Sequence, residues 1–510
     1  MAAVVDQTDK AGDKGLKLGA LGLGSAIVIG VASTAPGYSL AAGLGGIVGE
    51  VGQQAPAIIL LAFVPMFFIA SAYKYMNKVD PDCGTTFTWV TRAVGPKSGW
   101  IASWGLIMAD LVIMPNLAGI SGQYLFLLIG KPEWAGNRWA VLAVGVLFIL
   151  AMTWICVIGI ELNAKTQMGL LGAEVIVLVV FAVVALAKSS TTPSLSWLNP
   201  LEIQNEDGSF NWTGLAAGIN LSLFIYWGWD TAVAVNEECK DPEKTPGRAA
   251  VISTIILVAN YVIVSVAVIS VASVDELTES SDVLESSAAT VFGEAGFGPF
   301  MLKLLIIAVL SSAAASCQTT ILPAARSTLS MGVHKAIPER FAETHPRFLT
   351  PTFSTWLFGG IAVAWFVFLI AVSGGDWQED TSPYALSIAA VGLMIAFYYG
   401  ATGFAAVLYF WKYLFKSAKA FFLVGVSSLL GAGILTWSFI TTLIDDNFGN
   451  LTKIGLGLLL VGVPLMWMCR GIDGGSFFQI RRDPMDVRPD PFDDGANAPA
   501  LGTYTKETAR

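Results

Sequence analysis

The pattern of hydrophobic and polar positions divides this chain into long apolar stretches that are separated by short polar connections. Each stretch is about 20 residues long or longer, which is the length that an α-helix needs to cross the hydrocarbon core of a bilayer. The sequence therefore predicts an all-α membrane protein with twelve transmembrane helices. We expect these spans at residues 19–49, 54–75, 96–129, 138–159, 163–187, 213–237, 249–272, 298–325, 353–374, 384–411, 419–443 and 451–470.

Two of these stretches are interrupted by residues that break a helix. Residues 31–37 of the first stretch read VASTAPG, and residues 226–230 of the sixth read YWGWD. Proline suits the first turn of a new helix, and glycine adopts backbone conformations that other residues avoid. The sequence therefore predicts that spans 1 and 6 are broken near the middle of the membrane, where discontinuous helices of transporters form their substrate sites. The alternative is a kinked helix whose Ser and Thr side chains bond back to its own carbonyl groups.

The two breaks offer complementary partners for a small charged molecule. A half-helix that begins at Pro36 would present free N–H groups and the positive end of its dipole, which attract a carboxylate. The carbonyl groups around Phe224 to Trp227 would be unpaired and would attract an ammonium group or another cation. Together they fit an α-amino acid, although packing or lipid contact is the alternative role of each aromatic side chain. The residues expected to contact the substrate are Ala32, Ser33, Thr34, Ala35 and Gly37 in span 1 and Phe224, Tyr226, Trp227, Gly228 and Trp229 in span 6.

Three carboxylates fall inside predicted spans, where ionisable residues are costly and often functional. Asp230 stands where the second half of span 6 begins, so we interpret it as a helix cap, with a substrate ligand as the alternative. Asp110 in span 3 and Glu174 in span 5 have no helix end to cap and are expected to face the interior of the bundle. There they would exchange protons or bind a cation; the alternative is a structural group that bonds to neighbouring hydroxyls.

Other polar groups lie close to the predicted site or on its inner side. The small residues 311–316 of span 8 are expected to allow close helix packing, with hydroxyl ligands for a cation as the alternative. Tyr398 and Tyr399 of span 10 are candidates to reach the cavity. Glu237 and Glu238 are candidates for an inner gate that pairs with lysines or with the basic loop after span 8, and a solvated charge cluster is the alternative.

Composition supports a membrane protein and excludes several classes of function. Of the 510 residues 55% are hydrophobic and 13% are charged, whereas an average soluble domain is about 25% charged. The formal net charge of −9 says little about partners because the charges lie in loops, and nothing supports nucleic-acid binding. The five cysteines show no CxxC spacing, and the only histidines, His334 and His345, share one loop where we expect them to be solvated. The sequence predicts no catalytic residue, no metal site and no cofactor, so proton chemistry in the membrane would use carboxylates or hydroxyls.

The distribution of basic residues predicts the orientation of the chain. With an even number of spans, both termini lie on one side of the membrane. All Lys and Arg residues fall on that side except Lys131, Arg138, Lys188, Lys303 and Lys453. The positive-inside rule then places both termini in the cytoplasm, in a multi-pass protein of the plasma membrane.

The order of the breaks predicts the domain organisation. Spans 1–5 would start inside and spans 6–10 outside, and each set begins with a broken span, so the sequence predicts an inverted five-helix repeat. The expected segments are a cytoplasmic N-terminal tail at 1–18, a first repeat at 19–187, an extracytoplasmic loop at 188–212, a second repeat at 213–411, spans 11 and 12 at 412–470, and a cytoplasmic, disordered tail at 471–510.

Several motifs point to one family of transporters. The segment YWGWDTAVAVNEECKDPEKTPGRA at 226–249 resembles the sixth-span signature of amino acid permeases in the amino acid, polyamine and organocation superfamily. The GTTFTWVTRAVGPKSGW segment before span 3 and the ARSTLSMGVHKAIPERFAETHPRFLTP segment after span 8 resemble the same family. This resemblance implies the LeuT-type fold, with the substrate backbone held by the breaks of spans 1 and 6. Many relatives carry a Lys in span 5 that is tied to proton coupling, and Glu174 stands at its place in GIELNAKTQMGLLGAE.

We therefore expect a secondary active transporter that moves an amino acid across the plasma membrane by proton symport with alternating access. Glu174 is the expected coupling residue, and the expected partners are an amino acid or related amine, H⁺ and membrane lipid. The main alternative is a permease or exchanger for polyamines or other cationic amines, which Asp110 and Asp230 would favour if both faced the cavity. Sodium-coupled transport and a sensor with a transport fold are less favoured.

Overall fold

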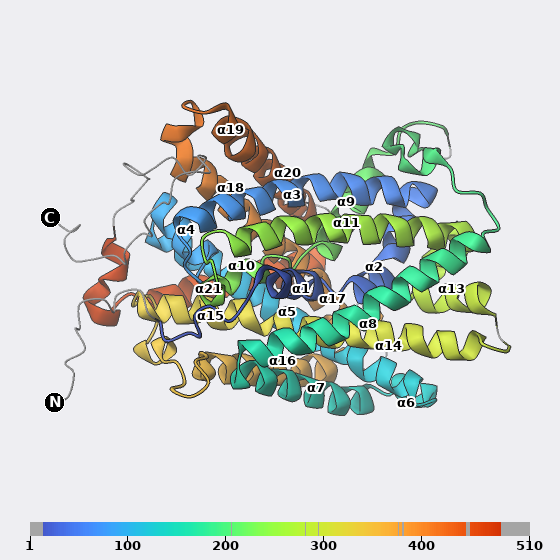
Figure 1. Ribbon diagram of the computed structural model, residues 1–510, viewed down its shortest axis with the longest axis horizontal. Coiled ribbons are helices and arrows are strands. Elements are labelled where there is room, and N and C mark those ends of the chain that lie inside the picture. The colour runs from blue at the N-terminus through green and yellow to red at the C-terminus, as the bar shows by residue number, and fades with distance from the viewer. Residues whose placement is uncertain are drawn as a thin grey trace.

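The computed structural model describes residues 14–205, 207–280, 282–293, 295–375, 377–379, 382–444 and 449–480. Within these ranges the chain is helical and forms no strand beyond two isolated bridges. The helices lie side by side along one common direction and form a single bundle (Figure 1). This architecture is the all-α membrane fold that the hydrophobic pattern predicts.

The first half of the bundle contains eight α-helices in the described residues. Each long helix begins and ends within a few residues of a predicted span, because polar and glycine or proline residues bound the apolar runs. The bounds are α1 Leu23–Ser33, α2 Pro36–Val51, α3 Ala55–Val79, α4 Thr86–Ala93, α5 Pro96–Leu128, α6 Pro132–Ala135, α7 Arg138–Ile158 and α8 Ile160–Ala187.

The second half follows a polar connection that holds only short 3₁₀ turns. Its first helix is short because the chain leaves the helix at Tyr226. The bounds are α9 Trp212–Ile225, α10 Thr231–Ala234, α11 Thr245–Val271, α12 Val274–Glu279, α13 Val283–Phe292, α14 Gly298–Thr319, α15 Ile321–Val333, α16 Thr352–Ser373, α17 Pro383–Ala389, α18 Val391–Leu414, α19 Ala418–Ala420, α20 Ser427–Ile444 and α21 Gly449–Cys469.

The described helices are long and apolar enough for a multi-pass membrane protein. Within the described residues, nine helical runs pass by length and composition, and four of them join neighbouring helices. The number is ten if the bent pair Lys453–Cys469 and Ile472–Gln479 counts as one span. One continuous apolar run, Leu23–Val79, is 57 residues long. A straight helix of that length would measure about 86 Å, nearly three times the hydrocarbon thickness of about 30 Å, so this run holds more than one crossing. The count of twelve spans stays a prediction.

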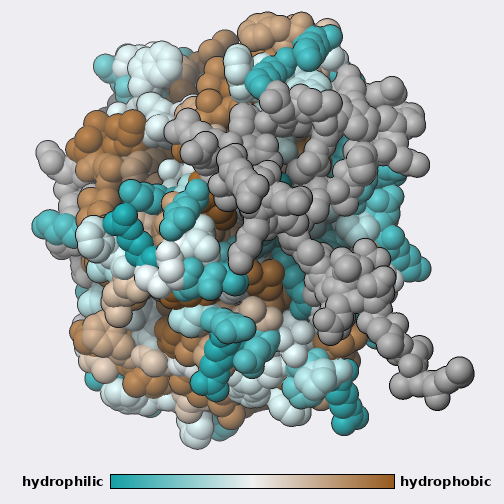
Figure 2. Space-filling view, turned by 90° about the vertical axis from the view of Figure 1, so that its left-hand side faces the viewer, coloured by the Kyte–Doolittle hydropathy of each residue, from teal (hydrophilic) through white to brown (hydrophobic). Residues whose placement is uncertain are grey.

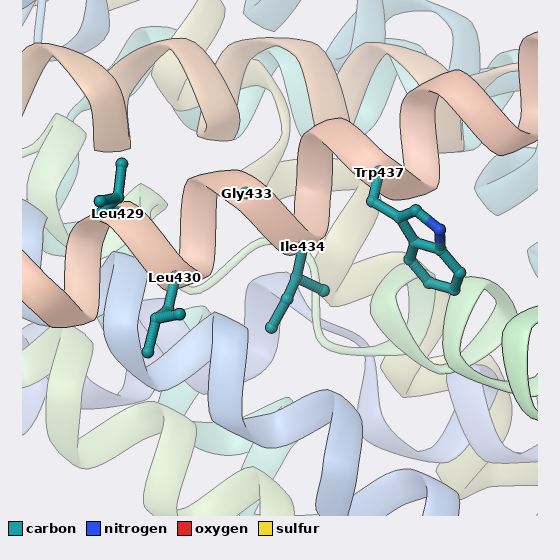
Figure 3. Close-up of a pocket in the computed structure, with 5 residues that line it drawn as sticks. All are labelled: Leu429, Leu430, Gly433, Ile434 and Trp437. Carbon is teal, nitrogen blue, oxygen red and sulfur yellow. The ribbon is translucent and has the colours of Figure 1, made fainter.

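The outer surface of the bundle is apolar, as a lipid environment requires. Large hydrophobic side chains are exposed along α7, α8 and α16, and the core beneath them is packed with buried aromatic and aliphatic groups. A shallow apolar hollow of about 240 Å³ on α20 belongs to this surface (Figure 3). It is lined by Leu429, Leu430, Gly433, Ile434 and Trp437 and offers almost no polar group for a substrate.

Both ends of the described chain meet at one end of the bundle. Lys14 pairs with Asp82 in the connection between α3 and α4, and Phe477 stacks on Phe87 of α4 with ring centroids 5.3 Å apart. Figure 2 looks onto this end, where hydrophilic residues are interspersed with apolar patches. A disordered tail from 471 onward is wrong for residues 472–479, which form two short 3₁₀ helices and bury Phe477. Residues 481–510 of that predicted tail lie outside the described residues.

Candidate functional site

The first predicted break separates α1 from α2. Helix α1 ends at Ser33, and Pro36 opens α2 with Ala35 as its N-cap residue. Ala35 has φ 47° and ψ 64°, in the left-handed region that favours glycine. The Thr34 and Ala35 N–H groups turn back onto the carbonyls of Val31 and Ala32 at 3.1 Å each. The regular helix is therefore interrupted at Thr34 and Ala35, within a buried segment.

The second predicted break lies directly against the first. Helix α9 ends at Ile225, residues 226–230 form turns, and α10 begins at Thr231. Gly228 has φ +120°, and a Cβ atom placed on it would lie 2.7 Å from the Ser33 carbonyl oxygen. The Ser33 and Thr231 hydroxyls are 2.8 Å apart and share a hydrogen bond. The two irregular segments therefore form one structural unit, although 198 residues separate Ser33 from Thr231.

The N-terminus of α2 already holds a carboxylate of the protein itself. The Gly37 N–H group donates to Glu174 Oε1 at 2.6 Å, and the Ser312 hydroxyl donates to the same oxygen at 2.9 Å. The Tyr38 N–H group donates to Ser312 Oγ at 3.2 Å. The expectation of free N–H groups at this helix end is therefore wrong for the structure as it stands. The Glu174 carboxyl group occupies the helix end that was expected to hold the substrate carboxylate, and binding of a substrate there stays a prediction.

Glu174 is fully buried and only half satisfied. Its second oxygen, Oε2, has no hydrogen-bond partner among the described residues. No Lys, Arg or His in the described part of the chain forms an ion pair with it. An ionised carboxylate without a counter-charge is costly to bury, and uptake of a proton removes that cost.

Carbonyl groups at both breaks also have partners within the protein. In span 6, Phe224 accepts from the Trp227 N–H group and Ile225 accepts from the Tyr261 hydroxyl at 2.6 Å. The expectation of unpaired carbonyls is wrong for these two residues. In span 1, Ser316 Oγ of α14 donates to the Ser33 carbonyl at 2.8 Å. Segment 311–316 therefore supplies hydroxyl groups to the first break. Its small residues were expected to allow close helix packing.

Asp230 is held by two tyrosines and does not cap a helix with its side chain. Tyr398 and Tyr399 of α18 donate to its two carboxylate oxygens at 3.0 and 2.8 Å. Although Asp230 occupies the N-cap position of α10, its side chain makes no cap hydrogen bond, so the capping interpretation is wrong. Trp227 Nε1 donates to the Tyr398 hydroxyl at 2.6 Å and joins the same cluster.

The remaining predicted site residues are buried around this cluster. Trp229 stacks on Tyr399 with ring centroids 5.2 Å apart, and the Tyr226 hydroxyl donates to the Ile59 carbonyl of α3. Asp110 of α5 is buried, its Oδ2 has no partner in the described residues, and it interacts electrostatically with Asp230. Except for Phe224, which is partly buried, the predicted substrate-contact residues are all buried: Ala32, Ser33, Thr34, Ala35, Gly37, Tyr226, Trp227, Gly228 and Trp229.

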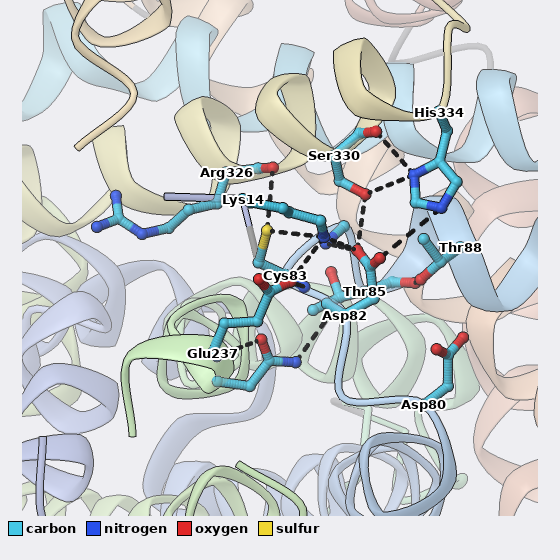
Figure 4. A network of polar contacts seen from close by, with 12 residues as sticks. Lys14, Asp80, Asp82, Cys83, Thr85, Thr88, Glu237, Arg326, Ser330 and His334 are labelled. Carbon is cyan, nitrogen blue, oxygen red and sulfur yellow. Dashed lines mark hydrogen bonds and ion pairs between the residues drawn. The ribbon is translucent and has the colours of Figure 1, made fainter. Parts of the chain in front are cut away.

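A second polar cluster, which we call the inner network, lies at the end of the bundle where the N-terminal segment enters (Figure 4). It consists of Lys14, Asp82, Cys83 and Glu237. The Lys14 ammonium group is 2.8 Å from Asp82 Oδ1, 2.6 Å from Glu237 Oε1 and 3.5 Å from Cys83 Sγ. The last three residues have the types and spacing of metal ligands, but the Lys14 ammonium group contacts all three in the place of an ion. Lys14 belongs to the predicted N-terminal tail at 1–18, and its side chain is 5% exposed in this cluster.

The predicted acidic pair finds two separate basic partners. Glu237 pairs with Lys14, and Glu238 makes a two-pronged pair with Arg326 of α15, with N···O distances of 2.8 and 2.9 Å. Both Glu238 and Arg326 are almost completely buried. The pairing rules out a solvated charge cluster, and the role of an inner gate stays a prediction. The expectation of a solvated His334 is wrong, because its side chain is 6% exposed and lies 3.9 Å from Asp82.

Lys14 and Asp82 of the inner network keep their charges at neutral pH. Burial lowers the pKa of Lys14, but its neighbours Asp82, Cys83 and Glu237 outweigh burial and hold that pKa well above its usual value. Burial raises the pKa of Asp82, but Lys14, His334 and the Ser330 hydroxyl together outweigh burial and hold that pKa below its usual value. The stability that Asp82 contributes is therefore present above the pKa of an unfolded Asp, about 3.9, and is lost as the pH falls through the folded value.

The sequence pattern indicated the buried polar residues more often than it indicated their hydrogen-bond and ion-pair partners. Lys14, Asp82 and Tyr261 were not singled out for contacts, because nothing in their local pattern marks them. Arg326 carried a usable signal, since an arginine at the end of an apolar span needs a counter-charge. Its partner Glu238 lies 88 residues away, so the pair itself was not predictable from spacing.

We predict that Gly228→Ala abolishes transport and lowers the thermal unfolding temperature of the purified protein. The left-handed backbone alone would cost about 1–2 kcal/mol, and the added Cβ would press on the Ser33 carbonyl. The matched control is Gly172→Ala in α8, where a Cβ meets nothing within 4 Å. Equal behaviour of the two variants in uptake and unfolding assays would contradict the close contact of the breaks.

We predict that Lys14→Gln destabilises the protein by about 2 kcal/mol, because it leaves Asp82 and Glu237 as partly buried carboxylates without their cation. Cys83, now fully buried, should react faster with a maleimide, which peptide mass spectrometry measures at each cysteine. The control is Lys17→Gln, because Lys17 and its partner Glu161 are about half exposed. Unchanged Cys83 labelling in Lys14→Gln would show that Lys14 does not close this end.

Comparison with known proteins agrees with the motifs and the fold. A family model described as "Amino acid permease" matches residues 21–461. The chain is 25% identical to an uncharacterized transporter of Mycobacterium tuberculosis over 352 residues, which covers 68% of this chain and 72% of the relative. It is 23% identical to a serine/threonine exchanger of Bacillus subtilis, over 60% of this chain and 66% of the relative. It is also 23% identical to a vacuolar cationic amino acid transporter of Arabidopsis thaliana, over 71% and 61%. The chain therefore belongs to the amino acid permease family of transporters.

Proposed function

We propose that this protein is a secondary active transporter that moves an amino acid across the plasma membrane by proton symport with alternating access. Membership of the permease family supports transport of a small molecule. The observation that carries the coupling mechanism is the contact of Glu174 with the Gly37 N–H group at the start of α2. Both termini are cytoplasmic in this proposal, since most basic residues gather on that side.

The proposal includes a twelve-span LeuT-type arrangement of two inverted five-helix repeats. Helices α1 and α2 form its first span and α9 and α10 its sixth, so that the substrate lies where Ser33 meets Gly228. The run Leu23–Val79 supports this division because it is too long for one crossing. Helix α9 supports it because 14 residues span only about 21 Å as a helix.

Proton coupling follows from competition for the N-terminus of α2. Gly37 and Tyr38 offer the N–H groups that suit a substrate carboxylate, and in this structure Glu174 and Ser312 accept them. An ionised Glu174 and a substrate carboxylate at the same helix end would repel each other in a medium of low dielectric constant. The substrate carboxylate therefore binds when Glu174 carries a proton. One proton enters with each substrate, which is the stoichiometric basis of symport.

Release uses the same competition in reverse. When the site opens to the cytoplasm, Glu174 loses its proton, returns to the Gly37 N–H group and displaces the substrate carboxylate. Glu174 faces the Ser312 hydroxyl of α14 and the Tyr261 hydroxyl of α11, and it forms no ion pair among the described residues. Glu174 is thus the group whose protonation state changes during the cycle.

We predict that Glu174→Gln keeps substrate exchange and loses accumulation. A glutamine oxygen still accepts from Gly37 and Ser312, but the side chain carries no proton to couple. In proteoliposomes, a pH gradient should drive uptake by the unchanged protein and not by the variant, whereas exchange of labelled for unlabelled substrate should continue in both. The control is Glu161→Gln on the same helix, which is half exposed. Gradient-driven accumulation by Glu174→Gln, or a strict need for sodium at constant pH, would contradict the proposal.

A second candidate function is transport of a polyamine or another cationic amine. It is favoured by Asp110 and Asp230, two buried carboxylates that interact and have no ion pair among the described residues. An amine without a carboxylate would leave Glu174 in place on α2. The two candidates therefore differ in which acidic group the substrate engages.

We predict that Asp110→Asn retains amino acid uptake and that neither the variant nor the unchanged protein transports putrescine. A thermal-shift screen with the twenty amino acids and common amines first identifies the ligand, and uptake of that ligand is then measured in both proteins. Putrescine uptake that Asp110→Asn abolishes, with no uptake of amino acids, would establish the second candidate and refute the first.

A further inference from the structure

A pocket of about 380 Å³ opens at the end of the bundle that carries the N-terminal segment. Three parts of the chain enclose it: the N-terminal segment at Lys17, the corner between α7 and α8 at Gly159, and the connection after α15 at Arg347. It is separate from the breaks of spans 1 and 6 and from the inner network. We call it the basic pocket.

The charge of the basic pocket is unbalanced in favour of cations. Lys17, Lys165 and Arg347 line it together with a single acidic residue, Glu161. Glu161 pairs with Lys17 at 2.8 Å. Lys165 and Arg347 are exposed and form no ion pair within the described residues. Two positive charges thus remain available for an anion.

The backbone of α8 adds to this preference. The helix begins at Ile160 directly behind Gly159, which has φ +144° and no side chain, and no side-chain group caps the helix end. The positive end of the helix dipole therefore points into a pocket that already contains excess cationic charge. A phosphate group, with several acceptor oxygens, suits guanidinium, ammonium and helix-end donors together.

The surroundings of the basic pocket favour the phosphate group of a lipid over a soluble phosphate. Trp154 lies one helical turn before the end of α7 and is 51% exposed, and Trp356 lies in the first turns of α16 and is 38% exposed. Their rings are 6.1 Å apart. Exposed tryptophans gather at the level of lipid head groups. Leu162, 40% exposed, lines the pocket and continues into the apolar outer face of α8.

We propose that the basic pocket binds the phosphate of an anionic membrane phospholipid. Lys165 and Arg347 contact the phosphate oxygens, Lys17 adds a third cation, and the acyl chains lie on the apolar surface that begins at Leu162. Basic pockets between helices on the cytoplasmic side are suited to such head groups. The bound lipid joins the N-terminal segment, α8 and the connection after α15, so it stabilises the arrangement that also contains the inner network.

Thermal unfolding of the full chain in detergent tests this proposal with four probes. These are phosphatidylglycerol, zwitterionic phosphatidylcholine, glycerol 3-phosphate and inorganic phosphate. The unfolding temperature should rise with phosphatidylglycerol at low concentration and should not rise with the other three. In the double variant Lys165→Gln/Arg347→Gln, the lipid concentration that gives half the rise should increase at least tenfold. The matched control is Lys97→Gln/Lys240→Gln, which removes two exposed charges outside the pocket and should behave as the unchanged protein.

Each other outcome overturns the proposal. A rise with glycerol 3-phosphate or inorganic phosphate equal to that with phosphatidylglycerol would make this a site for soluble phosphates. An equal loss in the double variant and in its control would show general attraction to a negative surface. If the double variant does not fold, the charge-conserving variant Lys165→Arg/Arg347→Lys replaces it. That variant should keep the response to phosphatidylglycerol, and loss of the response in a folded protein would show that positive charge alone does not explain binding.

Discussion

The hydrogen bond from the Gly37 N–H group to Glu174 Oε1 is the contact on which the proposed mechanism depends. It joins α8 to the start of α2, and Ser312 of α14 completes it by donating to the same oxygen. A helix that begins inside a membrane protein exposes N–H groups that have no water to bond to, and each unsatisfied group costs several kcal/mol. The chain meets this demand with a carboxylate from another helix. The same carboxylate then becomes the group that a substrate must displace or neutralise.

At both breaks, side chains from other helices supply the hydrogen bonds that the interrupted helices lack. Ser316 bonds the Ser33 carbonyl, and Tyr261 bonds the Ile225 carbonyl. In the proposed mechanism, a substrate that enters between the breaks replaces existing hydrogen bonds. The backbone groups then have partners with and without substrate, so neither state carries the cost of an unsatisfied group. The protonation of Glu174 would then decide which partner the N-terminus of α2 holds.

The positions of the helices could be predicted from the sequence, whereas the long-range contacts of their polar side chains could not. The run at 138–159 became α7 at Arg138–Ile158, because membrane length and apolar composition are local properties. The interruption before Pro36 was also a local property, since proline fixes the backbone where it stands and suits the first turn of a helix. Asp230 shows the limit: its position at the start of α10 suggested a cap, whereas Tyr398 and Tyr399, more than 160 residues away, hold its oxygens. His334 was misjudged for the same reason, because only the folded bundle brings Asp82 beside it.

The ion pairs of Lys14 and the ion pair of Arg326 lie at the same end of the bundle and differ in burial. Glu238 and Arg326 are 0% and 1% exposed, whereas Asp82 and Glu237, the partners of Lys14, are 12% and 13% exposed. Separating a fully desolvated pair leaves two uncompensated charges and costs about 3–5 kcal/mol. Water already reaches the Lys14 partners and compensates part of that loss. Separating Lys14 from Asp82 and Glu237 therefore costs less free energy than separating Glu238 from Arg326.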